Sequence, residues 1–374
     1  MKKPVNRRLI ALIRKEFIQI ARDPSSIAIA FALPLVLLLL FGYGVSLDAK
    51  AVPLALVVER PDSNSQDFLS GFYRSEYFIP LRVATLREAQ TLLLAKRVQG
   101  IVHLREDFTR RLKKGDGAPI QLIVNGIDAN TARLVQGYVT GVWNQWLVRR
   151  SLKMKSSSIF PLEVEQRIWF NPEVESRNFL VPGLIAVIMT LIGAMLTALV
   201  VAREWERGTM EAIMSTPVSI GEILLGKLIP YFLLGTGGLL LSVAMAVWLF
   251  EVPLRGSFWL LWLASSVFLL VALGMGFLIS TLTKNQFVAG QIAIIVTFLP
   301  AFILSGFIFD IHSMPTVIQW ITFLVPARYY VAILQTQFLA GDIWPVIWPN
   351  LLALTVMAVF FLGRTRQLSR KRLE

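Results

Sequence analysis

The chain has 374 residues, of which 55% are hydrophobic and only 16% are charged, and its mean hydropathy is +0.62. Soluble domains usually carry about a quarter charged residues, so the composition argues against a soluble protein. The formal net charge of +13 could suggest a nucleic-acid partner, but the basic residues gather at the ends of apolar segments, as topology signals do in membrane proteins, and nucleic acid is excluded.

Residues 1–25 are expected to form a basic amphipathic elbow helix on the cytoplasmic membrane surface. Apolar side chains recur at helical spacing, at Leu9, Ile13, Phe17 and Ile20, with arginine and lysine on the opposite face. Such a helix lies in the plane of the membrane interface. The proline of Asp23-Pro24-Ser25 is expected to break it before the first span. A simple basic flank is the alternative.

Six apolar stretches without a charged residue in their interior are long enough to cross a bilayer. The first covers 26–47, and the other five lie within 179–363, at 179–202, 228–250, 257–283, 286–309 and 343–363. We therefore expect an α-helical polytopic membrane protein with six transmembrane helices. The first stretch is too long for the apolar region of a cleaved signal peptide, although 49–51 offers a small-x-small site.

Basic residues mark one side of the membrane. They lie before the first span, between the second and third, between the fourth and fifth, and in the closing tail 364–374. Because lysine and arginine favour the cytoplasmic side, both termini are expected to be cytoplasmic. The long segment 48–178 is then outside the cell membrane.

This external segment alternates β-branched runs with amphipathic stretches. Strands are expected at 53–59, 78–84, 100–104 and 119–125, with helices at 64–74, 85–97, 106–114 and 128–153. The alternation predicts a compact α/β domain. A further strand at 163–170 and a linker at 153–158 are expected to lead back to the membrane.

The segment 311–342 is apolar but is interrupted by Pro315 and Pro326 and carries Arg328. These breaks exclude one continuous lipid-facing helix. Non-helical backbone at membrane depth must be buried in protein, so two short re-entrant helices in the outer leaflet are expected.

The cytoplasmic loop 203–222 contains a short charged helix. Gly208 is expected to interrupt the second span's helix, and Thr209 to cap the next turn. Met210, Ile213 and Met214 share one face, which predicts an exposed apolar knob suited to a groove on a partner protein. A plain solvated loop is the alternative, but it would not need apolar residues at helical spacing.

Two blocks of this sequence resemble the ABC-2 type transport permeases of bacteria. One is Glu206-Arg207-Gly208-Thr209-Met210-Glu211 with Thr216-Pro217-Val218-Ser219; the other runs from Leu304-Ser305-Gly306-Phe307-Ile308-Phe309 through Met314-Pro315 to Pro326-Ala327-Arg328-Tyr329-Tyr330. Arg22-Asp23-Pro24 also fits. The resemblance covers essentially the whole chain, and among these proteins it is most similar to the Ybh-type multidrug-export permeases of Gram-negative inner membranes.

The resemblance implies a division of labour. The loop helix couples to ABC ATPase subunits, which bind ATP and magnesium, through Glu204, Glu206, Arg207, Gly208, Thr209, Met210, Glu211, Ile213, Met214 and Pro217. A second permease half, either another copy or a paralogue, completes the path. An outer gate is expected at Pro300, Ser305, Gly306, Pro315, Pro326 and Arg328. The resemblance also places the chain in the bacterial inner membrane and the 48–178 domain in the periplasm.

The residues themselves argue against catalysis in this chain. Gly221 to Lys227 has the spacing of a phosphate-binding loop, but Leu228 follows where a hydroxyl is needed. With His103 and His312 far apart in the sequence and no cysteine, no metal site is expected. No cofactor is expected, and the chain is not expected to be an enzyme.

The expected function is therefore export of hydrophobic or amphiphilic compounds such as drugs, dyes or lipids, driven by ATP hydrolysed on a partner subunit. Besides membrane lipid, periplasmic envelope or adaptor proteins are further candidate partners. Two alternatives stay open. One is a membrane-anchored envelope sensor or scaffold, and the other is an ion-coupled secondary transporter, which the charge-free span interiors disfavour. The cargo and the choice between homodimer and heterodimer do not follow from the sequence.

Overall fold

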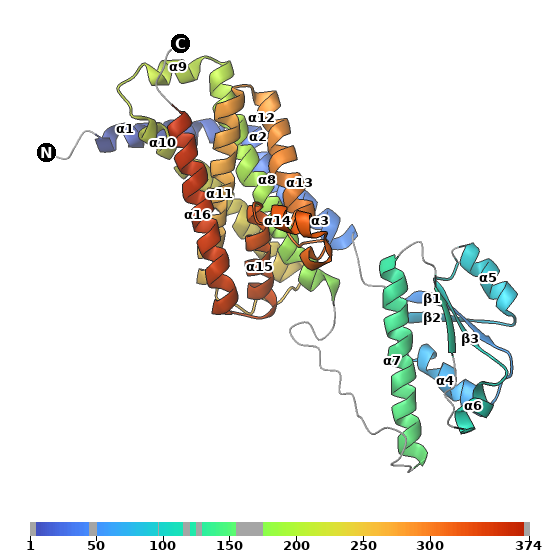
Figure 1. Cartoon of the computed structure of the whole chain (residues 1–374). Coiled ribbons are helices and arrows are strands. Elements are labelled where there is room, and N and C mark those ends of the chain that lie inside the picture. The colour runs from blue at the N-terminus through green and yellow to red at the C-terminus, as the bar shows by residue number, and fades with distance from the viewer. Residues whose placement is uncertain are drawn as a thin grey trace. The chain divides into compact units, whose positions relative to one another are not determined.

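The computed structural model describes residues 5–44, 51–95, 97–114, 120–124, 129–154 and 175–369. The chain forms two compact units: a helical unit of Met1–Ser46 with Ile168–Glu374, and an α/β unit of Leu47–Arg167. Figure 1 shows both. Each unit is described by itself below.

The helical unit contains the six spans that the sequence predicts. In the described part of the chain, six helices are long and apolar enough to cross a membrane: Pro24–Gly44, Ser176–Glu206, Ile220–Leu249, Phe258–Thr283, Gln286–Leu304 and Trp344–Leu368. In element labels these are α2 (Pro24–Ile27), η1 (Ala28–Ala32) and α3 (Leu33–Gly44); α8 (Ser176–Glu206); α10 (Ile220–Ala244) and η2 (Met245–Leu249); α11 (Phe258–Thr283); α12 (Gln286–Ala293), η3 (Ile294–Phe298) and α13 (Leu299–Leu304); and α16 (Trp344–Leu368). The predicted fold class is confirmed.

The second span, α8, is the centre of the helical unit. It is apolar on all sides and buried along most of its length, as expected for a helix surrounded by others. Small residues let α11 approach closely: a Cβ on Gly276 would lie 2.2 Å from the carbonyl oxygen of Ala194. Thr197 and Ser280 hydroxyls also donate across this contact, to Leu273 and Ala198 carbonyls at 2.8 and 2.7 Å. The two helices are therefore packed backbone to backbone.

Three spans contain a π-helical turn, which widens the helix by one residue. These are η1 in the first span, η2 in the third and η3 in the fifth. η3 immediately precedes the proline-containing helix α13, so the fifth span is irregular where Pro300 predicts a kink. Such π segments are often found at functional positions.

The segment after the fifth span forms two short helices, as predicted. A 3₁₀ turn, η4 (Ile311–Ser313), leads into α14 (Thr316–Thr322), and α15 (Pro326–Leu339) follows at an angle of 82°. Pro315 and Pro326 stand at the starts of these helices, where a missing N–H is harmless. α15 packs against α8 and α16.

The α/β unit has the predicted alternation of strands and helices. Its elements are β1 (Val52–Val58), α4 (Ser63–Tyr73), β2 (Phe78–Val83), α5 (Leu86–Leu94), β3 (Gly100–Leu104), α6 (Phe108–Lys114), β4 (Ile120–Val124) and α7 (Ala129–Met154). Most of the expected linker at 153–158 and the whole expected strand at 163–170 lie outside the described residues.

The four strands form one mixed sheet in the order β2-β1-β3-β4. β1 pairs in parallel with β2 and β3, whereas β4 runs antiparallel to β3. One face carries an aromatic core in which Phe68 and Phe72 of α4 meet Trp146 of α7. α5 covers part of the other face through Ala89. Among the strands that the structure describes, β2 is an edge strand paired only with β1.

Candidate functional site

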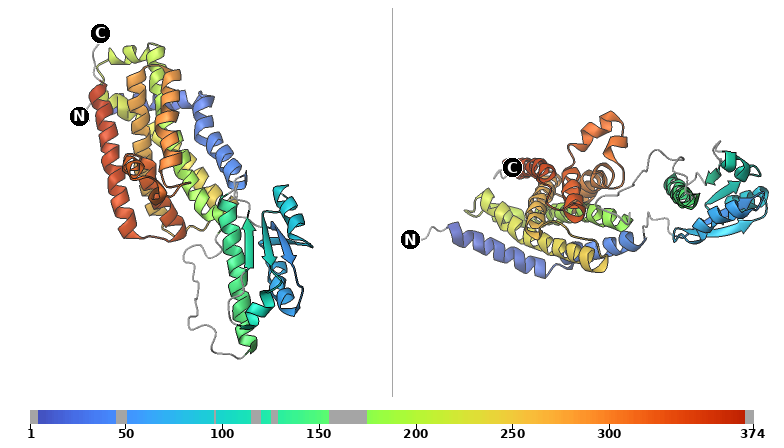
Figure 2. Two further views of the ribbon diagram at one scale, coloured as in Figure 1. Left: turned by 45° about the vertical axis from the view of Figure 1, so that its right-hand side comes forward. Right: turned by 90° about the horizontal axis from the view of Figure 1, so that it is seen from below.

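The elbow helix α1 (Val5–Ala21), the short helix α9 (Thr209–Met214) and the C-terminal end of α16 lie at one end of the helical bundle. Figures 1 and 2 show α1 projecting sideways beneath α9 at this end. α1 packs against α10, where a Cβ on Gly226 would lie 2.9 Å from the Leu12 side chain. The predicted coupling loop therefore stands directly over the elbow helix.

A buried cluster of four charges joins these elements. Lys227 of α10 donates to Glu16 of α1 at 2.7 Å and lies 2.5 Å from a carboxylate oxygen of Glu204 on α8. Lys15 bridges the same two carboxylates. Glu16, Glu204 and Lys227 are each only 2% exposed. A buried ion pair is strongly disrupted when one partner is removed, so the cluster ties α1, α8 and α10 together.

Lys15 lies at the rim of this cluster. Burial alone would lower the pKa of its ammonium, but the carboxylates of Glu204 and Glu16 outweigh that effect and raise the pKa. Lys15 therefore stays charged. Its contact with Glu204 joins the middle of the elbow helix to the end of the second span.

A second bridge lies at the end of α1. Arg203 of α8 donates to Asp23 at 2.7 Å, and the Ser25 and Ser26 hydroxyls donate to the same carboxylate. Burial opposes ionisation of Asp23, yet these hydrogen bonds and the Arg203 charge lower its pKa to about 2. The Asp-Pro-Ser turn is therefore fixed to the second span as well as capping α2.

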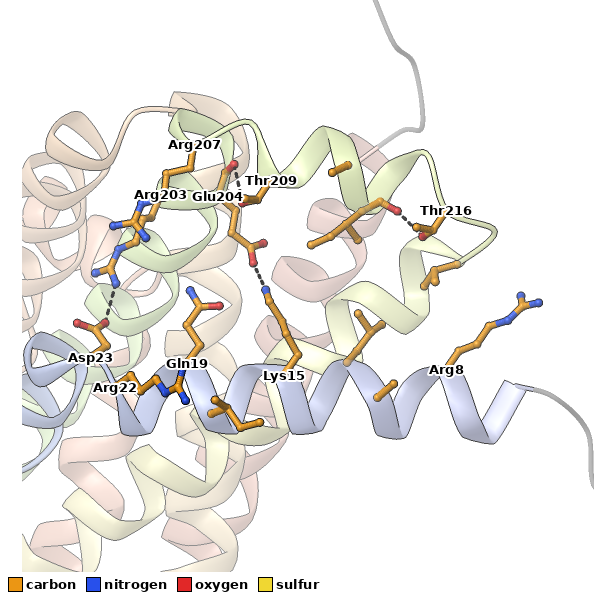
Figure 3. A pocket seen from close by; sticks show the side chains of 16 residues that line it. Arg8, Lys15, Gln19, Arg22, Asp23, Arg203, Glu204, Arg207, Thr209 and Thr216 are labelled. Carbon is orange, nitrogen blue, oxygen red and sulfur yellow. Dashed lines mark hydrogen bonds and ion pairs between the residues drawn. The ribbon is translucent and has the colours of Figure 1, made fainter.

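Between α1 and the α8–α9 turn lies a groove of about 930 Å³. Figure 3 shows it with Arg203 facing Asp23 at one end, and Lys15 facing Glu204. At the other end Arg8 donates to the carbonyl of Pro217 at 2.6 Å. Arg22 and Arg207 also line the groove. Among its charged lining residues, five are basic and two are acidic.

The structure corrects the predicted cap of α9. Gly208 has φ +66°, a left-handed conformation, and itself occupies the N-cap position. The Thr209 hydroxyl instead donates to the Glu204 carbonyl at 3.2 Å. The interruption at Gly208 is as expected, whereas the capping role given to Thr209 is wrong.

The predicted exposed knob is also wrong. Met210 and Met214 are 5% and 9% exposed and pack against Val201, Ile223 and Phe277. The helical spacing of these apolar residues is real, but their face is covered by α8, α10 and α11 of the same chain. Ile213 is half-buried and lines the groove. Direct contact of Met210 and Met214 with a partner is therefore excluded in this conformation.

The other predicted coupling residues divide by exposure. Glu204 is buried in the charge cluster, so it is not available to a partner in this conformation. The exposed members are Glu206, Arg207, Gly208, Thr209, Glu211 and Pro217. Their coupling role stays a prediction.

The predicted outer-gate residues lie at the opposite end of α8. Gly306 has φ +83° and reverses the chain after α13, and Phe307 then packs against Gly183, near the start of α8. The buried Ser305 hydroxyl accepts from the Phe307 N–H at 3.3 Å. Pro300 lies in α13, just after η3. Ser305 and Gly306 thus shape the turn after α13, whereas Pro300 lies within that helix. The gating role of all three stays a prediction.

Arg328 holds α14 against α15. Its guanidinium donates to the Thr322 hydroxyl and to the Gln319 carbonyl at 3.4 Å, and it lies 3.8 Å from the centre of the Phe323 ring. A cation at the last carbonyls of α14 complements that helix's dipole. Arg328 therefore stabilises the predicted re-entrant turn between Pro315 and Pro326.

Sequence reasoning missed Glu16, Lys15, Lys227 and the Asp23–Arg203 pair. It treated Lys227 as a topology signal between the second and third spans and as part of a rejected phosphate-loop pattern. The observed helices α8 and α10 extend beyond the predicted spans and include Glu204 and Lys227. One signal was available: Glu16 falls at helical spacing with Leu9, Ile13 and Ile20, so an acid interrupts the apolar face of α1.

The role that this arrangement of residues supports is mechanical. Within the described ranges, no group of three or more histidine, cysteine, aspartate or glutamate side chains could hold a metal ion. The clustered acids are instead paired with lysine and arginine. What the site can do is transmit a displacement of α9 or α1 to the spans α8 and α10.

Comparison with known proteins gives consistent matches. The family model described as ABC-2 family transporter protein matches residues 24–363. The chain is 46% identical over 374 residues to the probable multidrug ABC transporter permease YbhS of Escherichia coli K12, covering 98% of each chain. It is 29% identical to the probable multidrug ABC transporter permease YbhR of the same strain over 94% of this chain and 95% of that one. It is 27% identical to the inner membrane transport permease YhhJ, covering 82% of this chain and 81% of that one.

Proposed function

The chain belongs to the ABC-2 family of transporter proteins, and from that premise we propose that it is the membrane-spanning subunit of an ATP-driven exporter. In this proposal separate ATPase subunits bind ATP and magnesium and dock on the platform formed by α1 and α9. One observation carries it. α9 is not a loose loop, because Met210 and Met214 pack it against α8, α10 and α11. Beside it, the buried cluster of Glu16, Glu204 and Lys227 joins α1, α8 and α10.

The platform formed by α1 and α9 suits a partner protein that exerts force on α9. Arg207, Glu211, Ala212 and Thr216 are exposed beside the groove, while the apolar side of α9 is buried. Force applied to α9 passes through packed side chains and ion pairs to two spans and the elbow helix. The partner's grip would then rest on polar and charged contacts around the groove.

The proposed orientation places this platform in the cytoplasm of a bacterial inner membrane. Basic residues are concentrated in α1, the α8–α10 turn and the end of α16, which gather at one end of the bundle. Ile10, Phe17 and Ile18 of α1 are exposed apolar side chains, which fits a helix lying in the membrane interface. The α/β unit between the first and second spans is then periplasmic.

The proposal also covers the cargo, the direction of transport and the assembly. YbhS and YbhR are named as probable multidrug permeases, so we assign hydrophobic or amphiphilic compounds as cargo and export as the direction. α3, η3 and α13 expose large apolar side chains such as Leu40, Ile295 and Leu299. We assign part of this surface to a second permease half, a copy or a paralogue, and the rest to lipid.

Neither alternative is strengthened by a specific contact. The buried charges near the ends of α8 and α10 are paired with each other and with α1, an arrangement suited to structure rather than to ion coupling. A sensor acting through the α/β unit would have no use for a rigid platform at α9. ATP-driven transport uses it directly.

The test is a tagged pull-down from gently solubilised native membranes, with an ATPase assay on the eluate. We expect a nucleotide-binding subunit to co-elute with the wild-type chain, and Ala212→Arg on α9 to abolish the co-elution. Ala95→Arg in the α/β unit is the matched control, because Ala95 is also an exposed alanine and lies at the end of α5. A wild-type chain that elutes alone and hydrolyses nothing would contradict the exporter function.

A further inference from the structure

The end of the second span is hydrogen-bonded to the start of the fifth. The Glu206 carboxylate accepts from the backbone N–H of Gln286, the first residue of α12, at 2.8 Å. Beside it, the ammonium of Lys284 lies 4.7 Å from the centre of the Trp205 ring. Two consecutive residues of α8 thus hold the turn between α11 and α12.

We propose that Glu206 is a positioning residue that passes movement of the α9 platform to the cytoplasmic half of the fifth span. This inference rests on the proposed function, because it requires an ATPase that moves α9. It assigns Glu206 a partner within the chain. The family resemblance, by contrast, implied that Glu206 acts on the ATPase subunit.

The chemistry of the contact favours a firm link. The first N–H groups of a helix have no partner within the helix, and the dipole makes this end attractive to a carboxylate. Asn285 satisfies the N–H of Val288 at 2.9 Å, and Glu206 satisfies that of Gln286. One cap is therefore local and the other comes from α8. A charged acceptor makes the second the stronger kind of hydrogen bond.

Packing above this contact makes the cytoplasmic halves of both spans one body. Ala194, Ala198 and Ala202 of α8 form a buried cluster with Ala289 and Ala293 of α12. Alanines allow the helices to lie close together, with little side-chain freedom between them. A displacement of Glu206 is therefore carried along the whole of α12.

The helix changes character where this packing ends. η3 begins directly after Ala293, and Pro300 follows in α13. A π turn and a proline both weaken the regular hydrogen-bond ladder, so they are where a helix bends. Movement imposed at Gln286 is thus expected to turn the fifth span about Ile294–Phe298.

Because the donor is the backbone N–H of Gln286, a proline substitution can test this contact. Gln286→Pro removes the N–H together with the glutamine side chain, and proline is favoured at the first helical position. The preceding residue, Asn285, has φ −127° and ψ 127°, which is the conformation that proline requires before it. Gln286→Ala is the matched control, since it loses the side chain but keeps the N–H.

The experiment uses the full chain co-purified with its ATPase. Because the chain has no cysteine, single reporters can be placed at Phe287 on α12, which is 73% exposed, and at Ser215 beside α9. The measurement is the change in maleimide labelling rate on adding ATP with vanadate. We expect both reporters to respond in the wild-type background.

Removing either the Glu206 carboxylate or the Gln286 N–H should reduce the ATP response only at the reporter on α12. Glu206→Leu and Gln286→Pro are each expected to reduce the ATP response at Phe287→Cys about tenfold, the effect of losing one charge-assisted hydrogen bond. The Ser215→Cys response should be unchanged. Glu206→Gln, whose amide oxygen still accepts, should lose no more than about threefold. The Glu206→Leu/Gln286→Pro double variant should be no worse than either single variant.

Each contrary outcome is informative. A full response at Phe287→Cys in Gln286→Pro overturns this inference and leaves the exporter function standing. The same holds if Glu206→Leu prevents the ATPase from co-purifying, because Glu206 would then act on the partner directly. If the Ser215→Cys reporter, in a chain that is otherwise wild type, does not respond to ATP, the proposed function is overturned, and this inference with it.

Discussion

The Lys227 ammonium donates to the Glu16 carboxylate at 2.7 Å, joining residues 211 positions apart in the chain. This contact fixes the elbow helix to the third span, and Glu204 adds the second span to the same point. The three helices that an ATPase would have to move together are therefore joined by charges shielded from water. Salt screens such buried pairs far less than surface pairs.

Lys227→Met is expected to destabilise the helical unit by about 3 to 5 kcal/mol, because the buried carboxylates of Glu16 and Glu204 then share only the half-exposed Lys15. Thermal unfolding in detergent measures the change. Adding Glu16→Gln should recover part of the loss, since the single remaining carboxylate, Glu204, is then matched by Lys15. Exposed Glu211→Gln is the matched control and should alter stability little. Equal stability of Lys227→Met and the wild type would contradict the burial of this cluster.

Gly208 should tolerate asparagine better than valine. A Cβ at this position would meet open space, so the difficulty is only the left-handed backbone at φ +66°. Asparagine adopts that conformation readily, whereas a β-branched residue does so at a cost of about 1–2 kcal/mol or more. Gly208→Val is therefore expected to uncouple ATP hydrolysis from transport, and Gly208→Asn to retain most of the coupling. ATP consumed per molecule exported is the measurement, and equal coupling in both would refute the backbone explanation.

Stability should depend on acid through Asp23. Its pKa in the folded protein is about 2, below the value of 3.8 for the free side chain. Its contribution is therefore fully present above about pH 4 and is lost as the pH falls toward 2. The difference in melting temperature between the wild type and Asp23→Asn should shrink over that window. Other carboxylates titrate in both proteins, so a difference that stays constant from pH 6 to pH 2.5 would refute this origin.

Gly276→Ala should separate the second and fourth spans. The new methyl group would lie 2.2 Å from the Ala194 carbonyl oxygen, so the backbones must move apart. Overpacking of this kind typically costs about 1–3 kcal/mol. Gly363→Ala in α16 is the matched control, because a Cβ there meets nothing within 4 Å and alanine favours the helix. Melting temperatures should fall in the first variant and hold or rise in the second.

Most of the fold could be predicted from the sequence because it is set by local patterns. Apolar length alone gives the six spans, and alternation of strand and helix signals gives the α/β unit. Gly208 and Pro326 mark helix boundaries in the way that backbone geometry requires. These features need no knowledge of which segments meet in space.

The site could be predicted only in part, because its contacts are distant in sequence. The spacing of Met210 and Met214 indicates a common face, but nothing nearby reveals that Phe277 of the fourth span covers it. Lys227 and Glu204 lie just beyond the apolar runs, where charges usually meet water. Their burial depends on α1 folding over them, which a local pattern does not encode.

The edge of the sheet in the α/β unit has a consequence for crowded membranes. The Val52 N–H donates to the Tyr77 carbonyl, and in this parallel register Phe78, Pro80 and Arg82 direct their backbone groups to the unpaired edge of β2. Proline has no N–H, so the middle of that edge cannot donate to an added strand. Neighbouring copies packed side by side thus find an incomplete template for joining their sheets through β2, which disfavours this route to aggregation.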